Sequence, residues 1–157
     1  MALDLSKYLD VKVEDVSKVI PSIPAGTFFA EFQSWKGAER DYDKKDGVPK
    51  TPVVEVTFKL TGATDDVDFT EDFPEGNEVG KLVTKDYRLN DPDKAGHTYM
   101  RRLCEDTCKV ATKGLHFTDM LDAAKGSEVR VVNEPRSGQE EGQFFPNIKK
   151  VLPAEDE

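Results

Sequence analysis

An alternation of apolar and polar side chains predicts five β-strands, because successive residues of a strand point to opposite faces of a sheet. The expected strands cover residues 27–36, 53–60, 81–89, 127–133 and 143–151. In the first of these strands, Phe28, Ala30 and Phe32 share the core face, which places Trp35 on the opposite face. Pro146 interrupts the last strand, and since proline donates no backbone hydrogen bond, that strand is expected at a sheet edge or with a bulge.

A helical pattern separates the third strand from the fourth. Its start is predicted at Asp91, an N-cap residue, and Pro92, which suits the first turn. The apolar or small residues that then recur at helical spacing are Met100, Leu103, Cys104, Thr107, Cys108 and Ala111. They predict one strong helix. A second, short helix is predicted over residues 119–125 with Thr118 as its cap.

Three strands, a helix and two strands is the order of the five-stranded OB barrel, whose helix lies between strands 3 and 4. We therefore predict a mainly β protein with an OB-fold domain over residues 21–152, although an α+β roll shares this order of elements. A chain of 157 residues is long enough for one such core. Residues 1–20 are expected to form an N-terminal arm or a short helix, and residues 153–157 an acidic tail.

The formal net charge of -9 is unevenly distributed along the chain. Residues 61–80 contain seven acidic and no basic side chains, and residues 155–157 add three more acids. Residues 81–113, by contrast, contain eight basic and five acidic side chains. A nucleic-acid ligand requires local positive charge, and this segregation permits a cationic surface on an acidic protein. Segment 61–80 itself is expected to be a solvated loop, because its like charges repel.

The chain lacks the sequence patterns of common catalytic and metal sites. His97, Cys104 and Cys108 share one helical face, but zinc sites usually draw cysteines from short knuckles, so a plain core face is the preferred interpretation. The acids from Asp65 to Glu78 lack the glycine and the closing glutamate of a calcium loop. The sequence contains no nucleophile elbow and no glycine-rich phosphate loop. We therefore expect no enzymatic activity and no cofactor.

Aromatic and basic residues recur on the predicted strands and in the loop between the first two. The candidate nucleic-acid contacts are Trp35, Lys36, Arg40, Tyr42, Lys44, Lys45, Lys59, Lys85, Arg88 and Phe144. Cations follow a phosphate backbone, and a flat ring gives each base a stacking surface worth about 1–3 kcal/mol. Trp35 and Tyr42 are the discriminating residues, because an exposed ring in a polar setting has little structural purpose. In the alternative interpretation, Phe144 belongs to the core and the lysines only keep the surface soluble.

Four short motifs occur along the chain: Ile23–Phe28, Asp86–Pro92, Leu103–Cys104 and Phe145–Lys149. With them, roughly residues 20–153 resemble phage-encoded single-stranded DNA-binding proteins with an OB fold. The resemblance implies a protein that coats single-stranded DNA without sequence preference in phage replication or recombination. It also implies that the acidic tail recruits replication or recombination proteins. The tail is short and lacks the terminal aromatic residue typical of bacterial relatives.

Location and partners are also constrained by the sequence. It has no apolar run long enough for a membrane span and no signal-peptide pattern, so a cytoplasmic protein without a membrane partner is expected. The oligomeric state stays open, and a homo-oligomer is compatible with the sequence. The main rival to DNA binding is a protein-interaction or regulatory module, in which the acidic loop and tail meet a basic partner. A metal-dependent nuclease is the third alternative.

Overall fold

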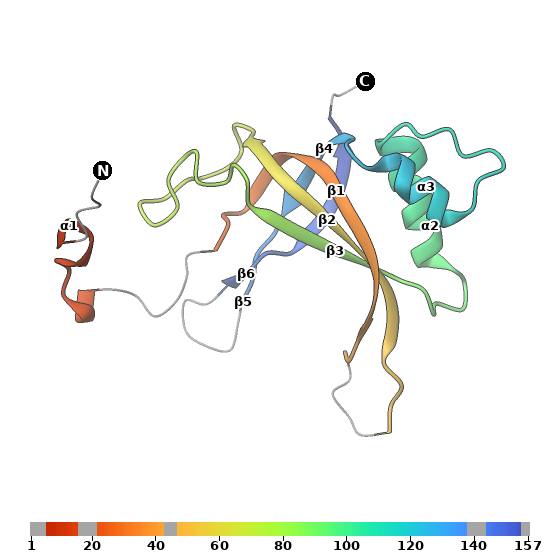
Figure 1. Ribbon diagram of the computed structural model, residues 1–157, viewed down its shortest axis with the longest axis horizontal. Coiled ribbons are helices and arrows are strands. Elements are labelled where there is room, and N and C mark those ends of the chain that lie inside the picture. The colour runs from red at the N-terminus through yellow and green to blue at the C-terminus, as the bar shows by residue number, and fades with distance from the viewer. Residues whose placement is uncertain (1–5, 16–21, 43–46, 138–143, 155–157) are drawn as a thin grey trace.

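The computed structural model describes residues 6–15, 22–42, 47–137 and 144–154. Within these ranges the main element is a five-stranded antiparallel sheet with the order β3-β2-β1-β4-β7 (Figure 1). Its strands are β1 (Gly26–Arg40), β2 (Thr51–Ala63), β3 (Leu82–Arg88), β4 (Glu128–Asn133) and β7 (Ile148–Pro153). Two further short strands, β5 (Arg136–Ser137) and β6 (Phe144–Phe145), pair with each other. The prediction of a mainly β fold is therefore confirmed.

Two α-helices lie between the third and fourth strands of the sheet, as predicted. They are α2 (Ala95–Arg102), which continues into the π-helical turn η2 (Leu103–Thr107), and α3 (Phe117–Ala124). The N-terminal region contains α1 (Ser6–Leu9) and the 3-10 turn η1 (Val13–Asp15). None of the helices in the described ranges is both long and apolar enough to cross a membrane.

The predicted helix over residues 91–111 starts later and divides in two. Asp91 and Pro92 belong to a turn, in which the Lys94 N–H donates to the Asp91 carbonyl at 3.0 Å. Lys94 has a left-handed backbone with φ of 57°, which prevents the helix from extending back to Pro92. After α2, the Cys108 N–H donates to the Leu103 carbonyl at 2.9 Å, the wider spacing of a π-helical turn. The prediction of Asp91 as the N-cap is wrong, because Lys94 holds that position.

The cap of α3 also differs from the prediction. His116 is its N-cap residue, and the His116 N–H donates to Asp119 Oδ2 at 3.2 Å. Thr118 lies inside the helix instead of capping it.

The hydrophobic core lies between the inner face of the sheet and the helices α2 and α3. Its largest members alternate along the strands and recur at helical spacing, and they include Phe28, Phe32, Val56, Phe58, Leu60, Met100, Leu103, Leu121, Val129 and Val131. Gly96 on α2 packs against the backbone of Arg88 so closely that an added Cβ would lie 1.7 Å from the Arg88 carbonyl oxygen. Only glycine permits this approach, so Gly96 determines where α2 lies on β3.

The sheet remains open between its two edge strands. Within the described residues no ladder joins β3 to β7, so the sheet is not closed into a barrel. The two edges nevertheless approach each other, because Lys85 Nζ on β3 donates to the Ile148 carbonyl on β7 at 3.0 Å. The strand predicted over residues 143–151 is divided at Pro146: β6 pairs with β5, and β7 begins after the proline. The edge position is confirmed for β7, which is the last strand of the sheet.

The acidic segment after β2 is packed rather than simply solvated, which corrects the sequence-based expectation. Val67 and Phe73 are buried in the core. Asp66 accepts hydrogen bonds from the Thr27 N–H at 2.9 Å and from the Thr27 hydroxyl at 2.8 Å. Hydrogen bonds, first from the Thr64 hydroxyl and then from the Thr27 backbone, lower the pKa of Asp66. The segment lies at the opposite end of the sheet from α2 (Figure 1).

Candidate nucleic-acid interface

A β-bulge in β1 inverts the face on which the later residues of that strand lie. Phe32 pairs with Phe58 on β2, but the next pair joins Ser34 to Thr57, which leaves Gln33 as an extra residue. Because one inserted residue shifts the alternation by one, the side chains of β1 beyond Gln33 exchange faces.

Trp35 is the candidate residue that this bulge displaces. It pairs with the buried Val56 and packs, partly buried, against the core. Its indole Nε1–H donates to Asp122 Oδ1 on α3 at 2.8 Å. The expectation that Trp35 is an exposed ring beside the basic loop is therefore wrong, and the cause is the single extra residue in β1.

The surface of β1, β2 and β3 that faces away from the core is here called the outer face. Rows of polar side chains cross its three strands. One row joins Lys36, Glu55 and Asp86. The adjacent row on this face consists of three hydroxyl residues, Ser34, Thr57 and Thr84. Lys59 follows on the same face of β2 and is exposed. Lysines and hydroxyls are common donors to phosphate and sugar oxygens.

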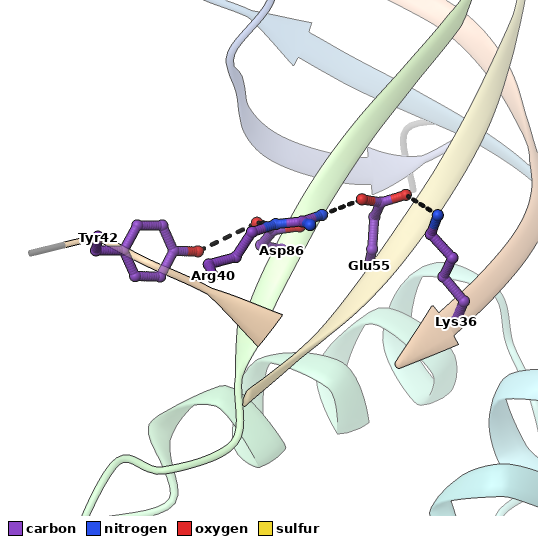
Figure 2. A network of polar contacts seen from close by, with 5 residues as sticks. All are labelled: Lys36, Arg40, Tyr42, Glu55 and Asp86. Atoms are coloured by element: carbon purple, nitrogen blue, oxygen red, sulfur yellow. Dashed lines mark hydrogen bonds and ion pairs between the residues drawn. The ribbon is translucent and has the colours of Figure 1, made fainter. Parts of the chain in front are cut away.

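Arg40 links two carboxylates of the outer face, Glu55 and Asp86 (Figure 2). Its Nε donates to Asp86 Oδ2 at 3.0 Å, and its Nη2 donates to Glu55. The Tyr42 hydroxyl donates to Asp86 Oδ2 at 3.1 Å, and Lys36 Nζ lies 3.8 Å from Glu55 Oε1. The hydrogen bond to Asp86 raises the pKa of Arg40, and partial burial raises the pKa of Tyr42. Glu55 and Asp86 are therefore already engaged by residues of the face, whereas a third acid, Glu31, lies across from Lys59.

Arg88 is a cation of this face that lies on an aromatic ring. Its guanidinium lies 4.5 Å from the centre of the Tyr42 ring, which is 45% exposed. Among the described residues no carboxylate forms an ion pair with Arg88. A guanidinium over an aromatic face is held by attraction to the ring, so the pair forms a fixed flat surface with one positive charge.

Lys85 lies apart from Arg88, although both were expected to line one groove. Their positions differ by three residues, so on a strand they point to opposite faces. Lys85 is half-buried on the core side of β3, and its Nζ is bound to the Ile148 carbonyl. Burial, and next the charge of Arg136, lowers the pKa of Lys85. The structure therefore does not bring Lys85 to the outer face with Arg88, and the phosphate contact predicted at Lys85 stays a prediction.

Three more candidate residues remain, and only Phe144 is among the described ones; it lies outside the five-stranded sheet. Phe144 belongs to the β5–β6 hairpin, where its ring is 46% exposed, so the alternative of a core residue is also wrong. Lys44 and Lys45 lie outside the described residues, as does the acidic end at residues 155–157.

A cleft beside Arg88 contains functional candidates that the sequence pattern did not indicate. It has a volume of about 720 Å³ and lies between β3, α2 with η2, and β7. Tyr99 and Arg102 of α2 line it, together with Lys149 and Lys150 of β7. The sequence signal that could have indicated this site was Tyr99 close to Arg101 and Arg102 within the predicted helix.

The described residues do not support a metal centre. No group of three His, Cys, Asp or Glu side chains among them is arranged to hold a metal ion. Cys104 is buried in the core, as the preferred interpretation predicted, and Cys108 is partly buried beside it. Burial raises the pKa of Cys104 to about 12 and that of Cys108 to about 11, so both thiols stay protonated. The His97 ring packs edge-on against Phe117.

Comparison with known proteins adds no family assignment. No protein-family model matches this sequence, and no curated protein matches it.

Proposed function

We propose that this protein binds single-stranded DNA, without sequence preference, across the outer face of β1, β2 and β3. The observation that carries this proposal is the exposed pair of Tyr42 and Arg88. A nucleotide offers a flat base and a phosphate, and this pair offers a stacking ring and a cation with no carboxylate partner among the described residues.

The rest of the outer face supports the same ligand. Lys36 and Lys59 are exposed on it, and a row of hydroxyls separates them. Arg40 holds Glu55 and Asp86, which limits the repulsion that these acids would exert on a phosphate. None of these contacts reads a base edge in a way that depends on sequence, so the proposal is one of non-specific binding.

An OB fold is part of this proposal. The strand order, with the helices between β3 and β4, agrees with an OB barrel that is open between its third and last strands. OB folds bind oligonucleotides on the face of strands 2 and 3, which corresponds here to β2 and β3. A role in phage replication or recombination, with protein partners recruited by the acidic tail, is supported by the resemblance of the short motifs described above.

Fluorescence anisotropy with a labelled oligo-dT at low salt tests this proposal. Arg88→Ala and Tyr42→Leu are expected to weaken binding by about fivefold or more, since each removes a cation or a stacking ring. Tyr42→Phe keeps the ring and is expected to bind like the wild type. Arg101→Ala is the matched control, because Arg101 is an exposed arginine that pairs with Glu105 on α2.

The same experiment separates the proposal from its rival. A protein-interaction module predicts no anisotropy change for the wild type even at low salt, and that result would refute DNA binding. Equal affinities of Arg88→Ala, Tyr42→Leu and Arg101→Ala would instead show that the outer face is not the binding surface.

A further inference from the structure

The cleft between β3, α2 and β7 is large enough to hold part of a ligand. Its volume of about 720 Å³ lies within the range of about 300–1,000 Å³ that is typical of small-ligand sites. One wall is the end of β3, the second is α2 with η2, and the third is β7. The cleft thus occupies the place where the sheet is open.

Basic side chains predominate in the lining of this cleft. The basic ones are Lys85, Arg88, Arg102, Lys149 and Lys150, and the acidic ones are Asp86, Asp91 and Asp106. Arg40 already holds Asp86, and Glu134 pairs with Lys149 at 3.0 Å. Among the described residues, Arg102 and Lys150 have no carboxylate partner. In a chain with a net charge of -9, a site with this balance favours an anionic ligand.

The cleft also contains an aromatic ring that the core does not use. Tyr99 is 56% exposed, and the Arg102 guanidinium lies 5.9 Å from the centre of its ring. The pair repeats the arrangement of Tyr42 and Arg88 on the outer face. A ring beside a guanidinium in a cationic cleft suits a base and its phosphate better than an apolar ligand.

The cleft and the outer face are continuous at the end of β3. Asp86 and Arg88 belong to the polar network of the outer face and also line the cleft. We infer that the bound strand runs from the outer face over the end of β3 into this cleft, where Tyr99 stacks on a base and Arg102 and Lys150 contact phosphates. This inference rests on the proposed function.

Anisotropy titrations with oligo-dT of about 4 to about 16 nucleotides, the range of site sizes for OB folds, test the inference. The test variants are Arg102→Ala and Tyr99→Leu. Their matched controls are Arg101→Ala, a neighbouring arginine outside the cleft, and Tyr99→Phe, which keeps the ring. Thermal unfolding of each variant, measured by circular dichroism, verifies that the fold is retained.

The inference predicts that affinity for the longest oligonucleotide falls about fivefold or more in both test variants and stays near the wild-type value in both controls. The shortest oligonucleotide is expected to bind the test variants and the wild type equally. Removal of Arg102 should also reduce the magnitude of the slope of log affinity against log salt by about 0.7.

Two outcomes would overturn the inference while the proposed function stands. In the first, Arg102→Ala matches Arg101→Ala at every length although Arg88→Ala weakens binding. In the second, the shortest oligonucleotide loses as much affinity as the longest, which would make the cleft an independent nucleotide site. A wild-type protein that binds no oligonucleotide would overturn both proposals, and a peptide strand added to β3 would then be the next occupant to test.

Discussion

Arg40 and Arg88 show how neighbouring cations on one face serve different purposes. Arg40 donates to two carboxylates, which fixes its side chain and partly neutralises the negative charge of Asp86 and Glu55. Arg88 lies on a ring instead and has no carboxylate partner among the described residues. A charged group already held by two partners gains little from a phosphate, whereas Arg88 exchanges only water for it. The proposed binding therefore depends more on Arg88 than on Arg40.

The buried thiols give a prediction at the residue scale. Because burial holds the pKa of Cys104 at about 12 and that of Cys108 at about 11, thiolate is scarce at mildly alkaline pH in the folded protein. Iodoacetamide at a pH near the ordinary thiol pKa of 9.0 is expected to label both cysteines slowly until the protein is unfolded in denaturant. Mass spectrometry of timed samples measures the labelling.

The sign of the accompanying pH effect is fixed by the direction of these shifts. Above the ordinary pKa of 9.0 the unfolded chain loses its thiol protons first, so the two cysteines lower the stability as pH rises further. Rapid labelling of both thiols in the folded protein would show that the core between η2 and α3 is open.

At the scale of elements, the contact between α2 and β3 shapes the cleft. Gly96→Ala would normally favour a helix by about 1 kcal/mol. Here the new Cβ would lie 1.7 Å from the Arg88 carbonyl oxygen, so α2 has to move away from β3. We expect Gly96→Ala to destabilise the protein by about 1–3 kcal/mol, as overpacked sites do.

Urea denaturation of the Gly96→Ala variant, with Gly37→Ala as its control, measures this loss of stability. Gly37 lies on β1, where an added Cβ meets nothing within 4 Å. The Gly37 variant is therefore expected to stay within about 0.5 kcal/mol of the wild type, as surface changes usually do. A Gly96 variant that is as stable as the wild type would mean that α2 is not held against β3.

The sequence predicted the elements better than their details. The strands around Phe28, Phe58 and Val131 were predictable because alternation and burial agree there. The bulge at Gln33 was not, since a single extra polar residue leaves the alternation ambiguous, and Trp35 was misplaced as a result. The late start of α2 depends on the left-handed backbone of Lys94, and no sequence signal indicates this conformation for a lysine.

Part of the candidate site was also predictable. Lys36, Arg40, Tyr42 and Arg88 were expected together, and the structure brings them to one face. Tyr99 and the rest of the cleft were missed because periodicity tells which side of a helix is polar, but not which strand edge that side meets.

At the scale of the whole molecule, charge is separated along β3. This strand begins beside the acidic segment and ends near α2 (Figure 1). Its last residues line the cleft. Exposed charges further apart than about 8–10 Å are largely screened at physiological salt, so acids at the far end of the sheet repel a ligand weakly there. A net charge of -9 is consequently no argument against a polyanionic ligand.

Titration of the wild-type protein with oligo-dT at several salt concentrations tests the central claim most directly. If Lys36, Lys59 and Arg88 each contact one phosphate, log affinity is expected to fall linearly with log salt, with a slope of about -2. Contacts in the cleft would make the slope steeper. Absence of binding at low salt, or an affinity that does not change with salt, would contradict a cationic DNA-binding face.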